Sequence, residues 1–385
     1  MTVNHPRRLS WRIATRVRKG LSTGMATCTG VFGAVAGSGA TSSLDLYGSL
    51  SQGASYISDI AGGSSMRTDV GTMQPDRFGL RGSEDVGGGL RANFLLEGGF
   101  ATRTGASIVP GVLFNRNAWV GMSNGWGSVQ LGHQPDFMFD VIGKYSSGFQ
   151  LTNFFLFHPG NLDNLANTFQ ANNSIKLQTP ASQRWQVGAQ YGFASMPARD
   201  GPRSTTTLST YARYQQHGFS GALAFTLIKD RARMDLARST GVTRLFGQAL
   251  VSGVPITLPR QRIWGAGGAY RLDGLPLRLN ATLTGVQLKY RGRDESMRNA
   301  DLGAAWTYRP RNVLNLGYSR SAFAGGQWDL FSASHVHQFS KRTEWFALAV
   351  YQRAGNGLAH AAINGVGVSS TRNQTVLTSG IHHSF

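Results

Sequence analysis

The sequence predicts an all-β fold, a transmembrane β-barrel with a wet interior, and three observations support this. Apolar and polar residues alternate along almost the whole chain, which is the side-chain period of a strand. No segment approaches the roughly 20 apolar residues that a helix needs to cross a bilayer. The 385 residues include 50 Gly, a residue that suits bending strands and tight turns. This combination is typical of a barrel with a lipid-facing outside and a polar inside.

The first 40 residues differ from the rest of the chain. They contain six basic and no acidic residues, followed by a weakly apolar stretch at Leu21–Ala36 and by the small residues of Gly37–Ala40. This order predicts a secretory signal peptide over residues 1–40 and a barrel over residues 41–385, with a cut after Ala36 as the alternative. Cys28, the only cysteine, lies in this leader, so the mature chain offers no thiol or disulfide.

The clearest strand begins at Leu90 and carries a different chemistry on each face. Leu90, Ala92, Phe94, Leu96 and Phe100 share one face, and Arg91, Asn93 and Glu97 share the other. We expect the apolar set to face lipid and the polar set to face the lumen. About 16 strands of this kind are expected, and the other clear ones lie in residues 184–193, 277–284, 301–308 and 314–319.

Short turns and long links between these strands suggest two different ends of the barrel. The turns at residues 123–125, 216–218, 272–274 and 309–311 have tight-turn residues and are expected on the periplasmic side. The long links His133–Gln170, Lys229–Arg260 and Arg353–Arg372 are expected to be extracellular or folded inward. Interfacial girdles or ordinary strand propensity would explain the aromatics near strand ends, which are Trp119, Trp126, Trp264, Trp306, Tyr308, Trp328 and Trp345.

The chain is strongly basic, with 38 Lys and Arg against 19 Asp and Glu. Its arginines are spread singly over the strands, without the basic helix or finger of a nucleic-acid-binding protein, so no nucleic acid is expected as a partner. A positive lumen that attracts anions fits better. No metal, cofactor or catalytic residue is expected. His382 and His383 point to opposite faces of a strand, so they cannot chelate a metal together.

Several segments together resemble the trimeric general-diffusion porins of Gram-negative outer membranes, most closely the β-proteobacterial group. The similarity runs from about Ser43 to Phe385. Its landmarks are Leu44–Gly48, Arg77–Glu97, Phe114–Gly121, Asn172–Ile175, Ser340–Thr343 and His383–Phe385. The resemblance implies a 16-stranded antiparallel barrel whose third loop folds into the pore. It also implies a homotrimer in contact with outer-membrane lipid and lipopolysaccharide.

The family's pore constriction sets acidic residues of the third loop against arginines of the wall. Carried over by motif, the wall residues are Arg77 and Arg116, with Arg81 nearby, and the loop acids are Asp140 and Asp163. Gln170 stands where the family has a third arginine, and Gly132-His133-Gln134 replaces the family's Gly-Arg-Gln. A thinner cationic cluster implies only a weak anion preference. The resemblance also implies that the barrel-assembly machinery reads Phe385 as an assembly signal.

The middle of the third loop is unusually aromatic, with Phe149, Phe154, Phe155 and Phe157. These rings either make an apolar constriction or anchor the loop to the inner wall, and anchoring is favoured. The sequence thus predicts a passive outer-membrane pore for small hydrophilic solutes and anions, not an enzyme. Alternatives are a substrate-specific channel, an outer-membrane enzyme, or an adhesin that uses the long loops at residues 229–260 and 353–372.

Overall fold

The structure is a computed structural model that describes residues 42–150, 153–194, 205–230 and 234–385. The predicted signal peptide and its cut after Ala40 therefore lie outside the described residues. None of the described helices is long and apolar enough to cross a membrane.

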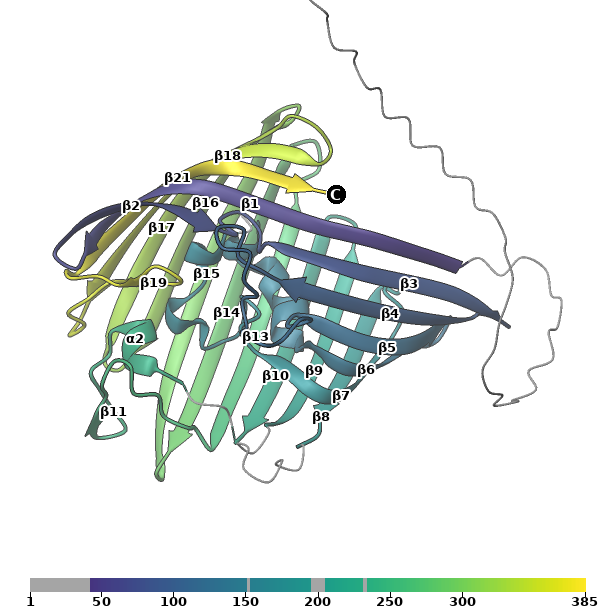
Figure 1. The fold of residues 1–385 in the computed structure, drawn as a ribbon, viewed down its shortest axis with the longest axis horizontal. Helices are drawn as coiled ribbons and strands as arrows, with labels where there is room; N and C mark the ends of the chain where they lie inside the picture. The colour runs from purple at the N-terminus through teal and green to yellow at the C-terminus, as the bar shows by residue number, and fades with distance from the viewer. Residues whose placement is uncertain (1–41, 151–152, 195–204, 231–233) are drawn as a thin grey trace, which may run out of the picture. The chain divides into compact units, whose positions relative to one another are not determined.

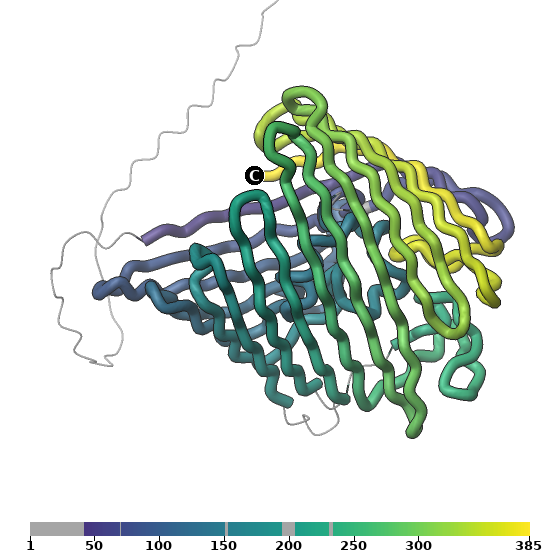
Figure 2. Tube along the Cα trace, turned by 180° about the vertical axis from the view of Figure 1, so that it is seen from behind, coloured from purple at the N-terminus to yellow at the C-terminus, as the bar shows by residue number. Residues whose placement is uncertain are grey.

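Antiparallel strands form one continuous sheet that closes on itself, because β21 pairs with both β18 and β1 (Figures 1 and 2). The closed sheet has 16 positions, as predicted, with β2 and β3 sharing one of them. Its strands are β1 (Ser42–Ile60), β2 (Gly63–Val70), β3 (Arg77–Gly87), β4 (Leu90–Gly99), β5 (Asn117–Asn124), β6 (Gly127–Pro135), β7 (Gln170–Gln178), β8 (Trp185–Gly192), β9 (Thr206–Gln216), β10 (Phe219–Lys229), β13 (Arg260–Arg271), β14 (Leu277–Tyr290), β15 (Arg293–Arg309), β16 (Asn312–Phe323), β17 (Gly326–Gln338), β18 (Thr343–Gly355) and β21 (Asn373–Ser384).

One barrel strand is interrupted between β2 and β3. The far half of β1 pairs with β2, and its first half pairs with β3. Between them the chain leaves the sheet at residues 71–76, where side chains replace the missing ladder bonds. The Asp76 carboxylate accepts a 2.6 Å hydrogen bond from the backbone N–H of Ser51, and the Ser51 hydroxyl accepts one from Met73. The interruption brings Gln74 and Pro75 to the lumen.

The distribution of polarity is the reverse of that in a soluble protein, as the alternation predicts. On β8, Gln186 and Gln190 are buried inside, while Trp185 and Val187 are exposed outside. On β14, Asn280 and Thr282 are buried, while Leu279 and Leu283 are exposed. An exposed apolar surface of this extent requires a lipid environment.

Tryptophans follow the girdle prediction only in part. Trp126, Trp264 and Trp306 are exposed on the barrel, as an interfacial residue would be. Trp328 is buried inside the barrel, where its indole N–H donates to the backbone carbonyl of His360. Trp119 lines the lumen. Ordinary side-chain packing explains the last two, because both lie on the inner face of their strands.

The predicted turns at residues 123–125, 216–218, 272–274 and 309–311 all lie at one end of the barrel, and the long links lie at the other. Helices and short strands occur mainly in these links. They are η1 (Met138–Ile142), η2 (Gly143–Tyr145), α1 (Ser147–Gln150), η3 (Phe154–Leu156), η4 (Pro159–Asn161), α2 (Leu236–Thr240), β11 (Arg244–Leu245), β12 (Gln248–Ala249), β19 (Ala362–Ile363) and β20 (Gly367–Val368).

The link at residues 136–169, here called the third loop, folds into the barrel and packs on the inner wall. The backbone carbonyls of Tyr145 and Leu162 accept hydrogen bonds from Asn280 of β14 and Gln261 of β13. Ser147 donates from its backbone N–H and its hydroxyl to the Asp301 carboxylate of β15, at 3.0 and 2.8 Å. The polar inner face of the barrel thus supplies the hydrogen bonds that an irregular segment needs.

Candidate constriction of the pore

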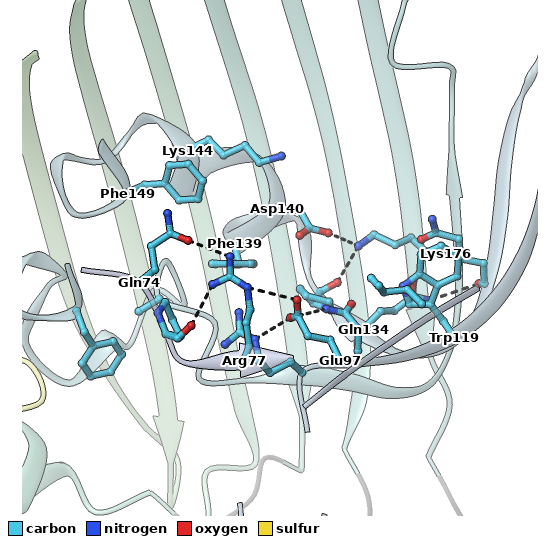
Figure 3. A pocket seen from close by; sticks show the side chains of 18 of the residues that line it. Gln74, Arg77, Glu97, Trp119, Gln134, Phe139, Asp140, Lys144, Phe149 and Lys176 are labelled. Carbon is cyan, nitrogen blue, oxygen red and sulfur yellow. Dashed lines mark hydrogen bonds and ion pairs between the residues drawn. The ribbon is translucent and has the colours of Figure 1, made fainter. Parts of the chain in front are cut away.

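The third loop narrows the lumen to a cavity of about 600 Å³ beside the inner wall. Strands β3 to β7 provide one side of this cavity and the third loop provides the other (Figure 3). Arg77, Arg116 and Asp140, three of the residues expected at the constriction, line it. The structure therefore brings the two wall arginines and one loop acid together.

Glu97 on β4 lies between the two wall arginines. Its carboxylate accepts a hydrogen bond from Arg116 at 2.7 Å, and Arg77 Nε lies 3.5 Å away. Tyr47 of β1 donates a further hydrogen bond at 2.8 Å. These contacts use both carboxylate oxygens and fix the directions of both guanidinium groups. Figure 3 shows the contact between Arg77 and Glu97. One acid thus neutralises only part of the charge of two cations.

A second ion pair joins the wall to the loop. Lys176 of β7 donates to the Asp140 carboxylate at 2.5 Å and to the backbone carbonyl of Pro135 at 2.8 Å. Its ammonium group also lies 4.7 Å from the centre of the Phe137 ring. Lys176 thereby holds the first turn of the third loop at the cavity.

Lys144 adds a fourth cation, from the loop side. It borders the cavity beside the aromatic residues of the loop (Figure 3) and has no ion pair among the described residues. Burial lowers the pKa of Lys144, and Arg213 and Lys176 lower it further, although Asp140 opposes this shift. Asp140 is close enough to favour the charge of Lys144 but does not form an ion pair with it, so the positive charge of Lys144 is only partly offset.

Aromatic side chains of the loop divide between the cavity and the wall. Phe149, Phe154 and Phe157 line the cavity. Phe155 is buried in an apolar cluster with wall residues that include Ile57, Leu348 and Val376. Phe155 and Phe157 are therefore both buried in apolar clusters with the wall, while the half-buried Phe149 and Phe154 contribute to an apolar side of the constriction.

The other residues expected at the constriction lie outside this cavity. Arg81 is exposed beyond it and pairs with Asp45 at 3.1 Å. Gln170 begins β7 and donates to the backbone carbonyl of Asn167. Asp163 is fully buried behind the loop, where it pairs with His158 at 2.6 Å and accepts a hydrogen bond from Thr284. Asp163 thus docks the loop and does not face the wall arginines.

Three charged residues at the cavity were not among the expected site residues, and two of them left a signal in the sequence. Glu97 had been placed on the lumen face by its alternation with Leu96. Lys176 shares a face with Ser174 of the Asn-Ser motif, two residues earlier. Lys144 gave no comparable signal, because its position depends on the path of the loop. In the described residues, no group of three or more His, Cys, Asp or Glu side chains is placed to hold a metal ion.

Comparisons with known proteins agree with this architecture. The family profile described as Gram-negative porin matches residues 26–357. The outer membrane porin protein 32 of Delftia acidovorans is 26% identical over 377 residues, 90% of this chain and 95% of its own length. An outer membrane porin protein of Bordetella pertussis is 36% identical over 129 residues, and that match spans only 32% of each chain.

Solved structures share the fold at low sequence identity. The anion-selective porin from Comamonas acidovorans superposes with a TM-score of 0.72 at 22% identity, over 90% of this chain and all of that one. OmpT of Vibrio cholerae superposes with a TM-score of 0.65 at 13% identity, over 89% of this chain and 98% of that one. From its family match, its closed 16-position sheet and its narrowed lumen, the chain belongs to the Gram-negative porins, which are channels of the outer membrane.

Proposed function

We propose that this porin is a passive channel for small hydrophilic solutes with a weak preference for anions, and that it performs no catalysis. The observation that carries the proposal is the charge of the cavity. Among the described residues that line it, the cations Arg77, Arg116, Lys144 and Lys176 outnumber the acids Glu97 and Asp140. The structural similarity to the anion-selective porin from Comamonas acidovorans supports this proposal.

The expected size of this preference follows from Coulomb's law. Two unit charges 4 Å apart interact by about 1 kcal/mol in water and by about 4 kcal/mol at an effective dielectric constant near 20. A wet pore lies between these limits, so one uncompensated cation changes the anion/cation permeability ratio by roughly fivefold or more. The preference stays weak because both acids are paired with the cations.

The test is the zero-current potential of the mature porin in planar bilayers across a KCl gradient at low ionic strength, where screening is smallest. The wild type should prefer chloride. Arg116→Ala and Arg77→Ala should each move the potential toward potassium, since either variant leaves Glu97 with one fewer cation. A cation-selective wild type, or arginine variants indistinguishable from it, would refute the proposal.

Arg81→Ala is the matched control. Arg81 lies on β3 four residues after Arg77, and it points to the same face of the strand. It pairs with Asp45 outside the cavity. We expect this variant to change the zero-current potential less than Arg77→Ala does, because Arg81 lies outside the constriction and Asp45 offsets its charge.

We propose further that the protein is a homotrimer in contact with phospholipid and lipopolysaccharide, assembled by the barrel-assembly machinery. Family membership supports this assembly. The exposed apolar face of the barrel also supports it, because part of such a surface must lie against lipid or against another subunit.

A further inference from the structure

The side of the cavity that the third loop provides is aromatic, and it stays so because the loop is fixed. Phe139, Phe149 and Phe154 are only half-buried and line the cavity. Backbone hydrogen bonds of the loop to Asn280 and to Asp301 hold the segment around Tyr145 and Ser147 against the wall. The half-buried rings therefore give the loop side of the cavity an apolar surface that a solute can contact.

Cationic groups border the same cavity. Arg77 donates to the Gln74 side chain at 2.9 Å and shares Glu97 with Arg116. Lys144 comes from the loop itself, five residues before Phe149, and no ion pair in the described part of the chain neutralises it. A solute in the constriction thus meets cations and aromatic rings at once (Figure 3).

We propose that the constriction preferentially binds and passes amphipathic carboxylates, that is, monoanions that carry a flat apolar ring, of which benzoate is the simplest. This inference rests on the proposed function and adds the class of solute. The carboxylate would form charge-assisted hydrogen bonds with Lys144 and Arg77. The ring would pack against Phe149 and Phe139 in an offset or edge arrangement.

The cavity suits this class of solute better than the alternatives do. Its volume of about 600 Å³ lies within the range of small-molecule sites. An inorganic anion or acetate can use the cations but leaves the rings in contact with water. A neutral aromatic alcohol can use the rings but leaves Lys144, which has no ion pair among the described residues, without a counter-charge. Only a solute with both features satisfies the whole lining.

The experiment measures how benzoate, acetate and benzyl alcohol block the chloride current of the mature porin in planar bilayers. The pH is about 6, so that both acids are ionised and His158 keeps the proton that favours the docked loop. Benzoate should block at a concentration about fivefold lower than acetate, and benzyl alcohol should block least. Benzoate and acetate that block at the same concentration would overturn the inference, as would benzyl alcohol that blocks as well as benzoate.

Variants separate the contribution of the rings from that of the charge. Phe149→Leu and Phe139→Leu should each remove most of the difference between benzoate and acetate and leave the KCl zero-current potential unchanged. Lys144→Gln should weaken the block by both acids equally. Phe331→Leu is the control, because Phe331 lies exposed on the outer face of β17 and should behave as the wild type. An unchanged benzoate preference in both ring variants would overturn the inference.

The zero-current potential, measured in the same bilayers, distinguishes a failure of this inference from a failure of the proposed function. A wild type without anion preference in the KCl gradient refutes the proposed function. An anion-preferring wild type that treats benzoate and acetate alike leaves the proposed function standing and overturns only the assignment of amphipathic carboxylates.

Discussion

At the scale of single residues, Glu97 controls how much positive charge the pore presents. It contacts Arg116 at 2.7 Å and Arg77 at 3.5 Å, and Asn117 and Tyr47 donate to it as well. A carboxylate in this position orders the guanidinium groups and also cancels part of their attraction for anions. Removing its charge while keeping its shape should therefore raise the anion preference.

The prediction at this scale concerns Glu97→Gln. With two wall arginines and no acid between them, the anion/cation permeability ratio should rise severalfold above that of the wild type, as measured by the zero-current potential in a KCl gradient. Glu84→Gln, at the far end of β3, is the matched control and should leave the ratio unchanged. A Glu97→Gln variant that becomes less anion-selective would show that ordering of the arginines outweighs their net charge.

At the scale of elements, the third loop carries buried ionisable groups that couple its docking to pH. Burial raises the pKa of Asp136 to about 6, although hydrogen bonds from Phe139 and Asn164 oppose this. Burial also opposes the charged form of His158, but the Asp163 carboxylate prevails and raises the pKa of His158 above its ordinary value. Asp140 and Asp301 are the other carboxylates close to this network.

Both shifts predict that the loop is held less tightly as pH rises. Between about pH 4 and about pH 6, Asp136 stays protonated in the docked loop but is ionised in a released loop. Because of this difference, raising the pH through this range weakens docking by up to about 3 kcal/mol. The proton on His158 is lost only above its ordinary pKa near 6.5, and docking then weakens again. Open-channel current noise should therefore increase between about pH 4 and about pH 6, and again above about pH 6.5.

Two variants show which residue causes each of the two increases in current noise. Asp136→Asn should abolish the increase in noise below about pH 6, and His158→Gln should abolish the increase at higher pH, because each removes one of the two titrating groups. Noise that stays constant over the whole range in the wild type, or that decreases, would contradict this account of the loop.

The strands of the barrel can be predicted from the sequence and the path of the third loop cannot, for a physical reason. A strand has a period of two, so the neighbours of Gln186 or Asn280 reveal which face each residue takes. The third loop has no period, and its path depends on wall residues more than 100 positions away, such as Thr284 and Asn299 for Asp163. The family resemblance therefore identified Arg77 and Arg116, which lie on or beside regular strands and line the cavity, and it also suggested Asp163, which lies behind the loop.

At the scale of the whole molecule, closure of the barrel depends on the last residues of the chain. The backbones of Phe385 and Gly48 exchange two hydrogen bonds of 3.1 Å, which extend the β1–β21 pairing. A Cβ atom at residue 48 would overlap the Phe385 ring, so Gly48 leaves room for the ring in this position. The terminal aromatic thus packs where the two ends of the sheet meet.

Deleting Phe385 should lower the amount of porin in the outer membrane and leave aggregates in the periplasm, because the closing contact and the proposed assembly signal are lost together. The measurement is the yield of folded trimer from fractionated membranes. Phe339→Ala, which removes an exposed aromatic from the β17–β18 turn at the same end of the barrel, is the control. A normal trimer yield after the deletion would argue against the assembly role.

The export signal that we propose for residues 1–40 leads to a separate prediction. N-terminal sequencing of the protein from isolated outer membranes should begin at Thr41, since the small residues Ser38 and Ala40 occupy the positions that a signal peptidase reads. A main species that begins at Met1 would contradict the signal peptide, and one that begins at Gly37 would select the alternative cut after Ala36.

The interruption between β2 and β3 has a consequence for how this porin can evolve. Residues 71–76 and the third loop together narrow the lumen, yet neither belongs to the hydrogen-bonded cylinder. Insertions or deletions in these two segments can therefore alter pore width and lining while strand number and strand register stay the same. The same barrel can in this way acquire different solute preferences in different lineages, because only residues 71–76 and the third loop need to change.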